Sequence, residues 1–196
     1  VAQGRGALLH RIGVPPTALE STATLVNIAQ LDRPDMQVKS LFRIIAESKG
    51  RVMEEIYRNA DAGILTDVNL LQEITLAARK AVGALVKEST NSEGRVEEVN
   101  TTMRDMMSFF MGGTPWKKSL EESGFPGCDD DYLKPQFNYL QFCLEQIVKN
   151  NELPSLMKGL NGEFIEPGPG GDPVRNPDVL PTGKNMHALD PQSIPT

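Results

Sequence analysis

Apolar residues recur at helical spacing along most of the chain, and short polar breaks separate the runs. Thr17 and Glu20 form a capping box, which predicts a helix running to about Gln30. A second helix is predicted from about Ser40. Its predicted buried side consists of Leu41, Ile44, Ile45, Val52 and Ile56. The first third of the chain is therefore expected to be helical.

The longest apolar stripe predicts a helix with Asp67 as its N-cap. The stripe comprises Val68, Leu71, Ile74, Ala78, Ala81 and Leu85. Another helix is predicted over residues 96–110, ended by Gly112 and Gly113. Thr114 and Pro115 are typical of the N-cap and first position of a short helix.

Two further helices are predicted, one beginning near Pro135 and a short one from Pro154 to Leu160. Beyond Gly162 the helical pattern stops, and half of the 14 prolines lie after it. The predicted fold is therefore mainly α. A bundle-like helical region over residues 1–162 is followed by a Pro/Gly-rich loop segment over residues 163–196, with at most short strands.

Composition narrows the possible functions. The net charge of −6 argues against binding to nucleic acid or to anionic membranes, since both need a basic surface. No apolar run approaches the roughly 20 residues of a transmembrane helix. Cys128 and Cys143 are too few for a disulfide scaffold, which favours a reducing compartment. The ends, Val1 and Thr196, are interpreted as cut from a longer chain.

Two clusters have alternative interpretations. The methionines between residues 103 and 111 could line a flat hydrophobic cofactor, but core packing is favoured. The acidic run over residues 129–131 could bind a hard cation, but a helix cap is favoured. The glycines of residues 168–171 lack the Lys-Ser of a P-loop, so nucleotide binding by this chain is not expected.

The final segment, EPGPGGDPVRNPDVLPTGKNMHALDPQSIPT, covers residues 166–196. Its glycines allow close backbone approach or positive φ angles, and its prolines stiffen the connection. Polar residues are spaced between them, together with a few apolar ones. This combination predicts a structured binding loop rather than a disordered tail.

The same segment closely resembles the large, porphyrin-binding H subunit of magnesium chelatase, and more loosely the large subunit of cobaltochelatase. The resemblance continues upstream through LVNIAQLDRP, IIAESKGR, GILTDVNLLQEIT and NNELPSLMKGLNGEFIEPGPGGDP. It covers about residues 20–196 and is weaker around residues 100–131. The chain is thus interpreted as an internal part of a much longer subunit.

The resemblance implies insertion of Mg²⁺ into protoporphyrin IX for chlorophyll biosynthesis, in the chloroplast stroma or the cytoplasm of a cyanobacterium. An AAA+ subunit and an integrin-like subunit would hydrolyse ATP as partners. Mg²⁺ and the porphyrin are then substrates, no tightly bound cofactor is expected, and the isolated chain is expected to be inactive. Cobalt insertion and a non-catalytic helical docking module remain the alternatives.

Metal insertion requires a base for the pyrrole protons and groups that hold the cation. Within the resembling segment, His187 is expected to act as the proton acceptor or as a transient metal contact, and Asp190 is expected to orient His187 or to bind water ligands of the metal. Glu166 and Asp172 are the expected metal contacts. The alternative is that His187 only hydrogen-bonds to a backbone carbonyl.

The remaining residues of this segment are expected to face the porphyrin. Arg175 and Lys184 would pair with its propionates, while Asn176 and Asn185 would hold the backbone of the loop. The full set expected to bind the porphyrin is Gly168, Gly170, Gly171, Arg175, Asn176, Lys184 and Asn185.

Overall fold

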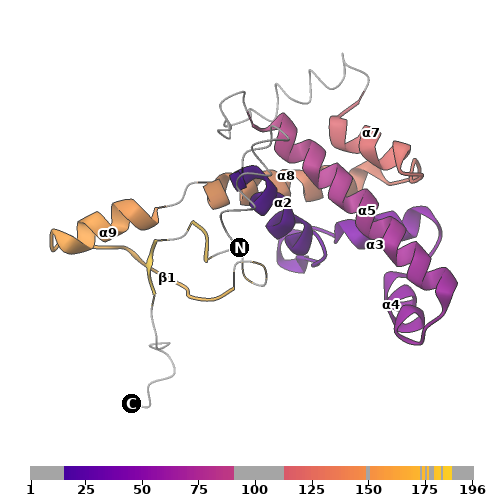
Figure 1. The fold of residues 1–196 in the computed structure, drawn as a ribbon, viewed down its shortest axis with the longest axis horizontal. Coiled ribbons are helices and arrows are strands. Elements are labelled where there is room, and N and C mark those ends of the chain that lie inside the picture. The colour runs from indigo at the N-terminus through magenta and orange to yellow at the C-terminus, as the bar shows by residue number, and fades with distance from the viewer. Residues whose placement is uncertain are drawn as a thin grey trace.

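A computed structural model describes residues 16–90, 113–148 and 151–186, apart from residues 173, 175, 177, 178 and 182. Its helices form a bundle, and a separate helix and two short strands follow it (Figure 1). The prediction of a mainly α protein is confirmed. The helix predicted over residues 96–110 lies outside the described residues.

The first helix, α2, spans Pro16–Ile28. It begins one residue before Thr17, so the predicted cap lies inside the helix. A 3-10 turn, η1, follows at Pro34–Met36, and α3 spans Leu41–Ser48. The side chain of Ser40 accepts a hydrogen bond from the Arg43 backbone N–H, which confirms the predicted start of this helix.

The single helix predicted from Ser40 to beyond Ile56 is wrong, because the structure has two helices there. After α3 the chain turns at Gly50, which has a φ of +66°, and α4 then spans Met53–Asp61. Glycine adopts this left-handed conformation without the steric cost of a Cβ atom. Val52, expected in the core, lies in the connection and is 51% exposed.

Helix α5 spans Leu65–Glu88 and is the longest helix of the described residues. Ile64 occupies its N-cap position, so the prediction of Asp67 as the cap is wrong. The Asp67 carboxylate instead accepts hydrogen bonds from the Arg51 guanidinium at 2.7 Å and from the Asn59 side-chain amide at 2.6 Å. This buried side chain therefore binds residues outside its own helix and does not cap the helix.

Helix α7 spans Pro115–Glu122, with Thr114 at the N-cap position as predicted. Helix α8 spans Asp130–Val148, five residues ahead of the start predicted at Pro135. The Asp129 side chain accepts a hydrogen bond from the Asp131 N–H at 3.0 Å, which satisfies a donor of the first turn. The favoured interpretation of the acidic run as a helix cap is confirmed.

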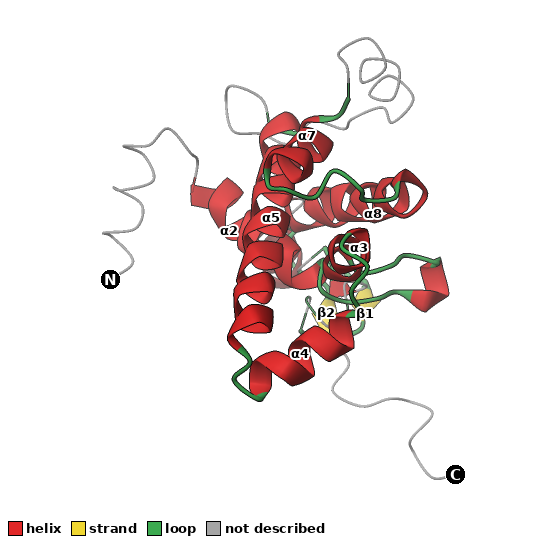
Figure 2. Ribbon diagram, turned by 90° about the vertical axis from the view of Figure 1, so that its right-hand side faces the viewer, coloured by secondary structure: helices red, strands yellow, loops and turns green. Residues whose placement is uncertain are grey.

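The core lies where α2, α3, α4, α7 and α8 meet α5 (Figure 2). Its largest fully buried side chains are Leu25, Ile28, Leu41, Phe42, Ile45, Ile56, Ile74, Leu85, Leu120, Phe125, Leu133 and Phe137. Trp116 of α7 stacks on Phe137 of α8 with ring centroids 4.1 Å apart. Among the helices of the described ranges, none is both long enough and apolar enough to cross a bilayer.

The last helix, α9, spans Glu152–Leu160, close to the predicted bounds. It lies at one end of the long axis of the molecule, and α4 lies at the other (Figure 1). Strands β1, Pro167–Gly168, and β2, Asn185–Met186, follow it and pair in parallel. They are the only strands named among the described residues, in agreement with the predicted short strands.

Candidate functional site

The parallel pair of β1 and β2 joins the two ends of the Pro/Gly-rich segment. Pro167 lies opposite Asn185, and Gly168 lies opposite Met186. The chain between the strands therefore leaves and returns to one place, beside α9. This arrangement defines the candidate site as α9 together with residues 163–186.

Gly168 is buried because the side chain of Lys184 crosses directly over it. A Cβ atom at position 168 would lie 2.4 Å from the Lys184 Cδ and 3.1 Å from its Cβ. The lysine ammonium group donates a hydrogen bond to the Leu180 carbonyl at 3.4 Å. A larger residue at this position would therefore force the Lys184 side chain to move.

Backbone hydrogen bonds organise the described part of the loop. The Asp172 carboxylate accepts a bond from the Val174 N–H at 3.0 Å, and the Asp172 carbonyl accepts one from the Asn176 N–H at 2.9 Å. The Asn176 carbonyl in turn accepts a bond from the Val179 N–H at 3.2 Å. Asp172 therefore begins an Asx-type turn, a local structure typical of this residue.

Two glycines in this segment have left-handed backbone conformations. Gly171 has a φ of +145°, and Gly183, which directly precedes Lys184, has a φ of +89°. Val179 and Leu180, which lie between these two glycines in the sequence, are buried. The segment therefore combines two buried apolar side chains with backbone turns that residues other than glycine rarely adopt.

Two adjoining cavities lie between α9 and the residues before β2. One, about 390 Å³, is lined mainly by apolar groups, including Leu156, Leu160 and Ile165. The other, about 360 Å³, has charged side chains on its walls, namely Lys158, Glu166 and Lys184. Because Lys184 lines both, the two cavities form one surface with an apolar part and a charged part.

The structure brings several of the predicted site residues to this surface and leaves others away from it. Glu166 and Lys184 line the charged cavity, and Gly168 lies beneath Lys184. Gly170 and Asp172 are exposed in the loop. Asn176 is half-buried in the same loop, and Asn185 lies in β2. Arg175, His187 and Asp190 lie outside the described residues.

Lys158 is a residue of this surface that sequence reasoning missed. It lies in α9 three positions after Ser155, so both belong to one side of the helix. Both line the charged cavity. Their spacing alone predicts that both lie on one side of the helix. Nothing in the sequence, however, indicated that the residues before β2 would return to this helix.

The chemistry available at the surface is that of charged side chains beside an apolar wall. A lysine ammonium can hold a carboxylate, and a glutamate can hold a hard cation or its water ligands. Within the described residues, no three or more His, Cys, Asp or Glu side chains are grouped to hold a metal ion.

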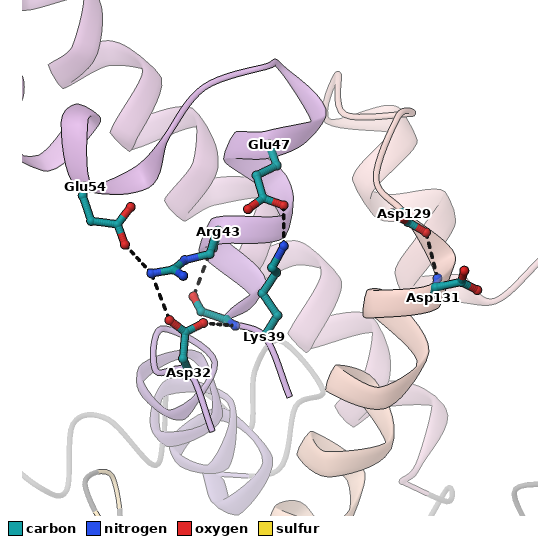
Figure 3. Close-up of polar contacts among 8 residues, drawn as sticks. Asp32, Lys39, Arg43, Glu47, Glu54, Asp129 and Asp131 are labelled. Carbon is teal, nitrogen blue, oxygen red and sulfur yellow. Dashed lines mark hydrogen bonds and ion pairs between the residues drawn. The ribbon is translucent and has the colours of Figure 1, made fainter. Parts of the chain in front are cut away.

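Several charged groups of the bundle, in contrast, are paired with one another. Arg43 pairs with Asp32 at 3.0 Å and with Glu54, and Lys39 pairs with Glu47 at 2.7 Å (Figure 3). These pairs connect the segment before α3 with α3 and α4. We interpret them as surface contacts that support packing.

Two side chains of the bundle, Asp67 and Cys128, have pKa values that differ from their ordinary values, and the structure gives the cause of each shift. The hydrogen bond from Asn59 is the main cause that lowers the pKa of Asp67, and Arg51 lowers it further against the opposing effect of burial. Burial raises the pKa of the Cys128 thiol. A thiol with a raised pKa is a poor nucleophile at neutral pH, so Cys128 has the properties of a structural cysteine.

Similarity to known proteins extends along nearly the whole chain. A family model described as CobN/Magnesium Chelatase matches residues 6–196. The chloroplastic magnesium-chelatase subunit ChlH of Oryza sativa subsp. indica is 51% identical over 188 residues, which is 96% of this chain and 14% of the relative. The chain therefore spans about one seventh of that relative.

Bacterial relatives match over shorter stretches. The H-type subunit of the magnesium chelatase of Chlorobaculum parvum is 50% identical over 131 residues, 64% of this chain and 10% of the relative. The aerobic cobaltochelatase subunit CobN of a Sinorhizobium species is 48% identical over 80 residues, 38% of this chain and 6% of the relative.

Proposed function

The chain belongs to the CobN/magnesium chelatase family, and we propose that it is part of the large, porphyrin-binding subunit of a magnesium chelatase. The observation that carries this proposal is the 51% identity to the rice subunit over 96% of the chain. Because the chain corresponds to only 14% of that relative, the activity belongs to the longer polypeptide. We expect residues 1–196 alone to insert no metal.

The proposed reaction is insertion of Mg²⁺ into protoporphyrin IX. Two pyrrole N–H protons must leave the macrocycle, and a strongly hydrated cation must lose water before the ring nitrogens can bind it. Partner subunits, an AAA+ ATPase and an integrin-like protein, would supply the free energy by hydrolysing ATP. Mg²⁺ and the porphyrin are substrates in this scheme.

We assign residues 163–196 to the region of the metal insertion site. Two features support this assignment: the charged cavity contains Glu166 and Lys184, and β2 ends at Met186, immediately before His187. In this proposal His187 accepts a pyrrole proton and Asp190 orients it. Glu166 and Asp172 contact the metal ion or its water ligands.

The porphyrin contacts follow from the same surface. Arg175 and Lys184 would pair with the propionates, and Lys158 adds a further cation on the opposite wall. Gly168 lets Lys184 lie close to the backbone. We propose that Gly170 and Gly171 let the loop approach the macrocycle, while Asn176 and Asn185 stabilise its backbone.

The relatives also suggest a location. The two rice subunits, which are 51% and 50% identical to this chain, are chloroplastic by name. We propose that the parent protein works in the chloroplast stroma or in the cytoplasm of a cyanobacterium, in chlorophyll biosynthesis.

Cobalt insertion is the second candidate function. It is favoured by the 48% identity of the Sinorhizobium cobaltochelatase subunit over 38% of the chain. Assays of the assembled enzyme with Mg²⁺ and protoporphyrin, and separately with Co²⁺ and a corrin precursor, would distinguish the two. Turnover of the corrin alone would exclude the magnesium proposal.

The role of the loop is tested by His187→Ala in the full-length subunit. We expect metal insertion to fall at least 100-fold, as for loss of a general base, with porphyrin binding unchanged by fluorescence quenching. His10→Ala is the matched control, because His10 is the only other histidine of the 196 residues. Full activity of the His187 variant with normal porphyrin binding would reject the catalytic role. It would then favour the alternative that this region is a docking scaffold.

A further inference from the structure

Helix α9 has one apolar face that solvent reaches. Leu153, Leu156, Met157 and Leu160 follow the spacing i, i+3, i+4 and i+7, so they form a stripe on one side of the helix. Phe164 continues the apolar surface just after it. All five side chains are between 53% and 80% exposed. These five residues are the α9 stripe.

This exposure differs from that of the other helices, whose apolar sides form the core. Helix α5 also has an apolar stripe, but Ile74, Val82 and Leu85 on it are almost fully buried. The α9 stripe instead lies at the end of the molecule away from α4 (Figure 1). Contiguous apolar surface of this kind is typical of an interaction site.

The short length of α9 strengthens this argument. Helices below about 12 residues are marginal in water, and in proteins most of their stability comes from packing of an apolar face. Helix α9 has only 9 residues and contains Pro154 and Gly159. Ile165 packs beneath Gly159, where a Cβ atom would lie 3.3 Å from the Ile165 Cδ1. That contact borders the apolar cavity that Leu156 and Leu160 also line, and it leaves all five side chains of the stripe more than half exposed, so the stripe still needs a partner.

We propose that the α9 stripe packs against an apolar surface in another part of the same full-length subunit. The inference rests on the proposed function, in which this chain is part of a longer polypeptide. The rice relative has about seven times the length of the matched region, since 188 residues are 14% of it. A surface on the same polypeptide is present at high effective concentration, so it binds ahead of a separate partner.

The position of the stripe gives this contact a role in the site. Leu156 and Leu160 belong to the stripe and also line the apolar cavity next to Lys184. Packing against the stripe would therefore close the apolar cavity on its open side. The rest of the subunit would supply a wall of the site, and α9 would hold residues 163–186 in a fixed position relative to that wall.

The test is the rate of thiol labelling in the full-length subunit. Leu156→Cys places a thiol on the stripe, and Lys158→Cys places one about 160° around the same helix, on an exposed residue. Native labelling rates at the two positions are read by peptide mass spectrometry and normalised to the rates in denaturant. We expect Cys at position 156 to react at least ten-fold more slowly than Cys at position 158, at any protein concentration.

Each other result overturns the inference. Equal normalised rates would show that the stripe is not selectively covered. Protection that disappears on 100-fold dilution would identify a second copy as the occupant. Protection that requires added porphyrin or partner subunits would identify those as the occupant. Labelling does not depend on metal insertion, so the two proposals can fail separately: the unsubstituted subunit, assembled with its partners, tests the proposed function by its Mg²⁺ insertion, and protection at position 156 tests this inference.

Discussion

The helical bundle from α2 to α8 and the segment from α9 to β2 owe their structures to different interactions. In the bundle, large apolar side chains from six helices fill a core around α5. In the segment, the structure depends on a glycine under a lysine stem, three left-handed glycines (Gly162, Gly171 and Gly183) and a run of backbone hydrogen bonds. Only Gly168, Val179 and Leu180 are buried among its described residues.

The bundle core therefore determines the global stability of the fold, whereas a few glycines determine the backbone shape of the segment. A core spreads its free energy over many contacts, so the bundle can define the fold while individual surface residues vary. A glycine-based loop contains little burial energy, so its shape depends on a few positions where a side chain cannot be added. We therefore expect substitutions in the bundle to act on global unfolding and substitutions in the segment to act on local structure and activity.

The largest effect is expected from Phe137→Ala. Phe137 is fully buried and stacks on Trp116 at 4.1 Å, so the substitution leaves a cavity in the core. We expect the free energy of unfolding to fall by about 3–5 kcal/mol, measured by urea denaturation with circular dichroism. Phe142→Ala in the same helix is the control, since Phe142 is 49% exposed and should change stability far less.

Asp67→Asn should give the next largest effect, and one that depends on pH. The pKa of Asp67 is lowered in the folded state by Asn59 and Arg51, so the charged form contributes stability above its ordinary value of 3.8. That contribution is lost as the pH falls through the lower, folded pKa.

The urea midpoint of Asp67→Asn should therefore lie below that of the unmodified chain at pH 7. The difference should shrink as the pH is reduced below 3.8. A difference that stays constant between pH 7 and pH 3 would show that the charge of Asp67 does not stabilise the bundle.

Gly168→Ala tests the segment. The added Cβ would lie 2.4 Å from the Lys184 Cδ and 3.1 Å from its Cβ, so the Lys184 side chain must move, and we expect this movement to disturb the pairing of β1 with β2. We expect a local cost of about 1–3 kcal/mol, seen as faster hydrogen exchange at residues 168, 185 and 186. Exchange in α5 should not change, and metal insertion by the full-length subunit should fall.

Two variants sharpen this test. Gly83→Ala in α5 meets open space, so it should stabilise the bundle by about 0.5–1 kcal/mol. Adding Lys184→Ala to Gly168→Ala removes the Lys184 Cδ and Cγ, which lie 2.4 Å and 3.3 Å from the new Cβ, and leaves the Lys184 Cβ at 3.1 Å, so exchange should become slower again. Fast exchange in the double variant would mean that the contact with Lys184 is not the reason for glycine at position 168.

The smallest effect is expected from Glu54→Gln. Glu54 pairs with Arg43 on the surface of the bundle, and exposed ion pairs contribute about 0–1 kcal/mol. The urea midpoint should shift only slightly and should converge with that of the unmodified chain at high salt. A large, salt-independent loss would indicate that this pair has a role beyond surface packing.

The sequence predicted most of the helices correctly because apolar periodicity reports which side of a helix is buried. It was wrong where one residue or one distant partner decides the local structure. Gly50 ends α3 by its left-handed conformation, and Arg51 and Asn59 take Asp67 away from a capping role. Asp129 allows α8 to begin before Pro135.

The sequence indicated which residues form the candidate segment, but not how those residues are arranged in space. Its glycines indicated close approach of the backbone, and at Gly168 that approach is made by Lys184. Strands of two residues have no periodic pattern, so the pairing of β1 with β2 could not be read from the sequence. The part played by Lys158 depends on that pairing and was missed for the same reason. The roles of His187, Asp190 and Arg175 stay predictions.

The parallel pairing of β1 with β2 has a practical consequence for protein engineering. The loop of residues 169–184 begins after Gly168 and ends before Asn185, and the strands that hold its two ends lie side by side. These residues can therefore be exchanged as a cassette. A loop of different length from a related chelatase could be grafted between these positions without moving its attachment points. Such chimaeras would test whether the loop contributes to the metal preference that we propose for the longer subunit, separately from the scaffold that carries the loop.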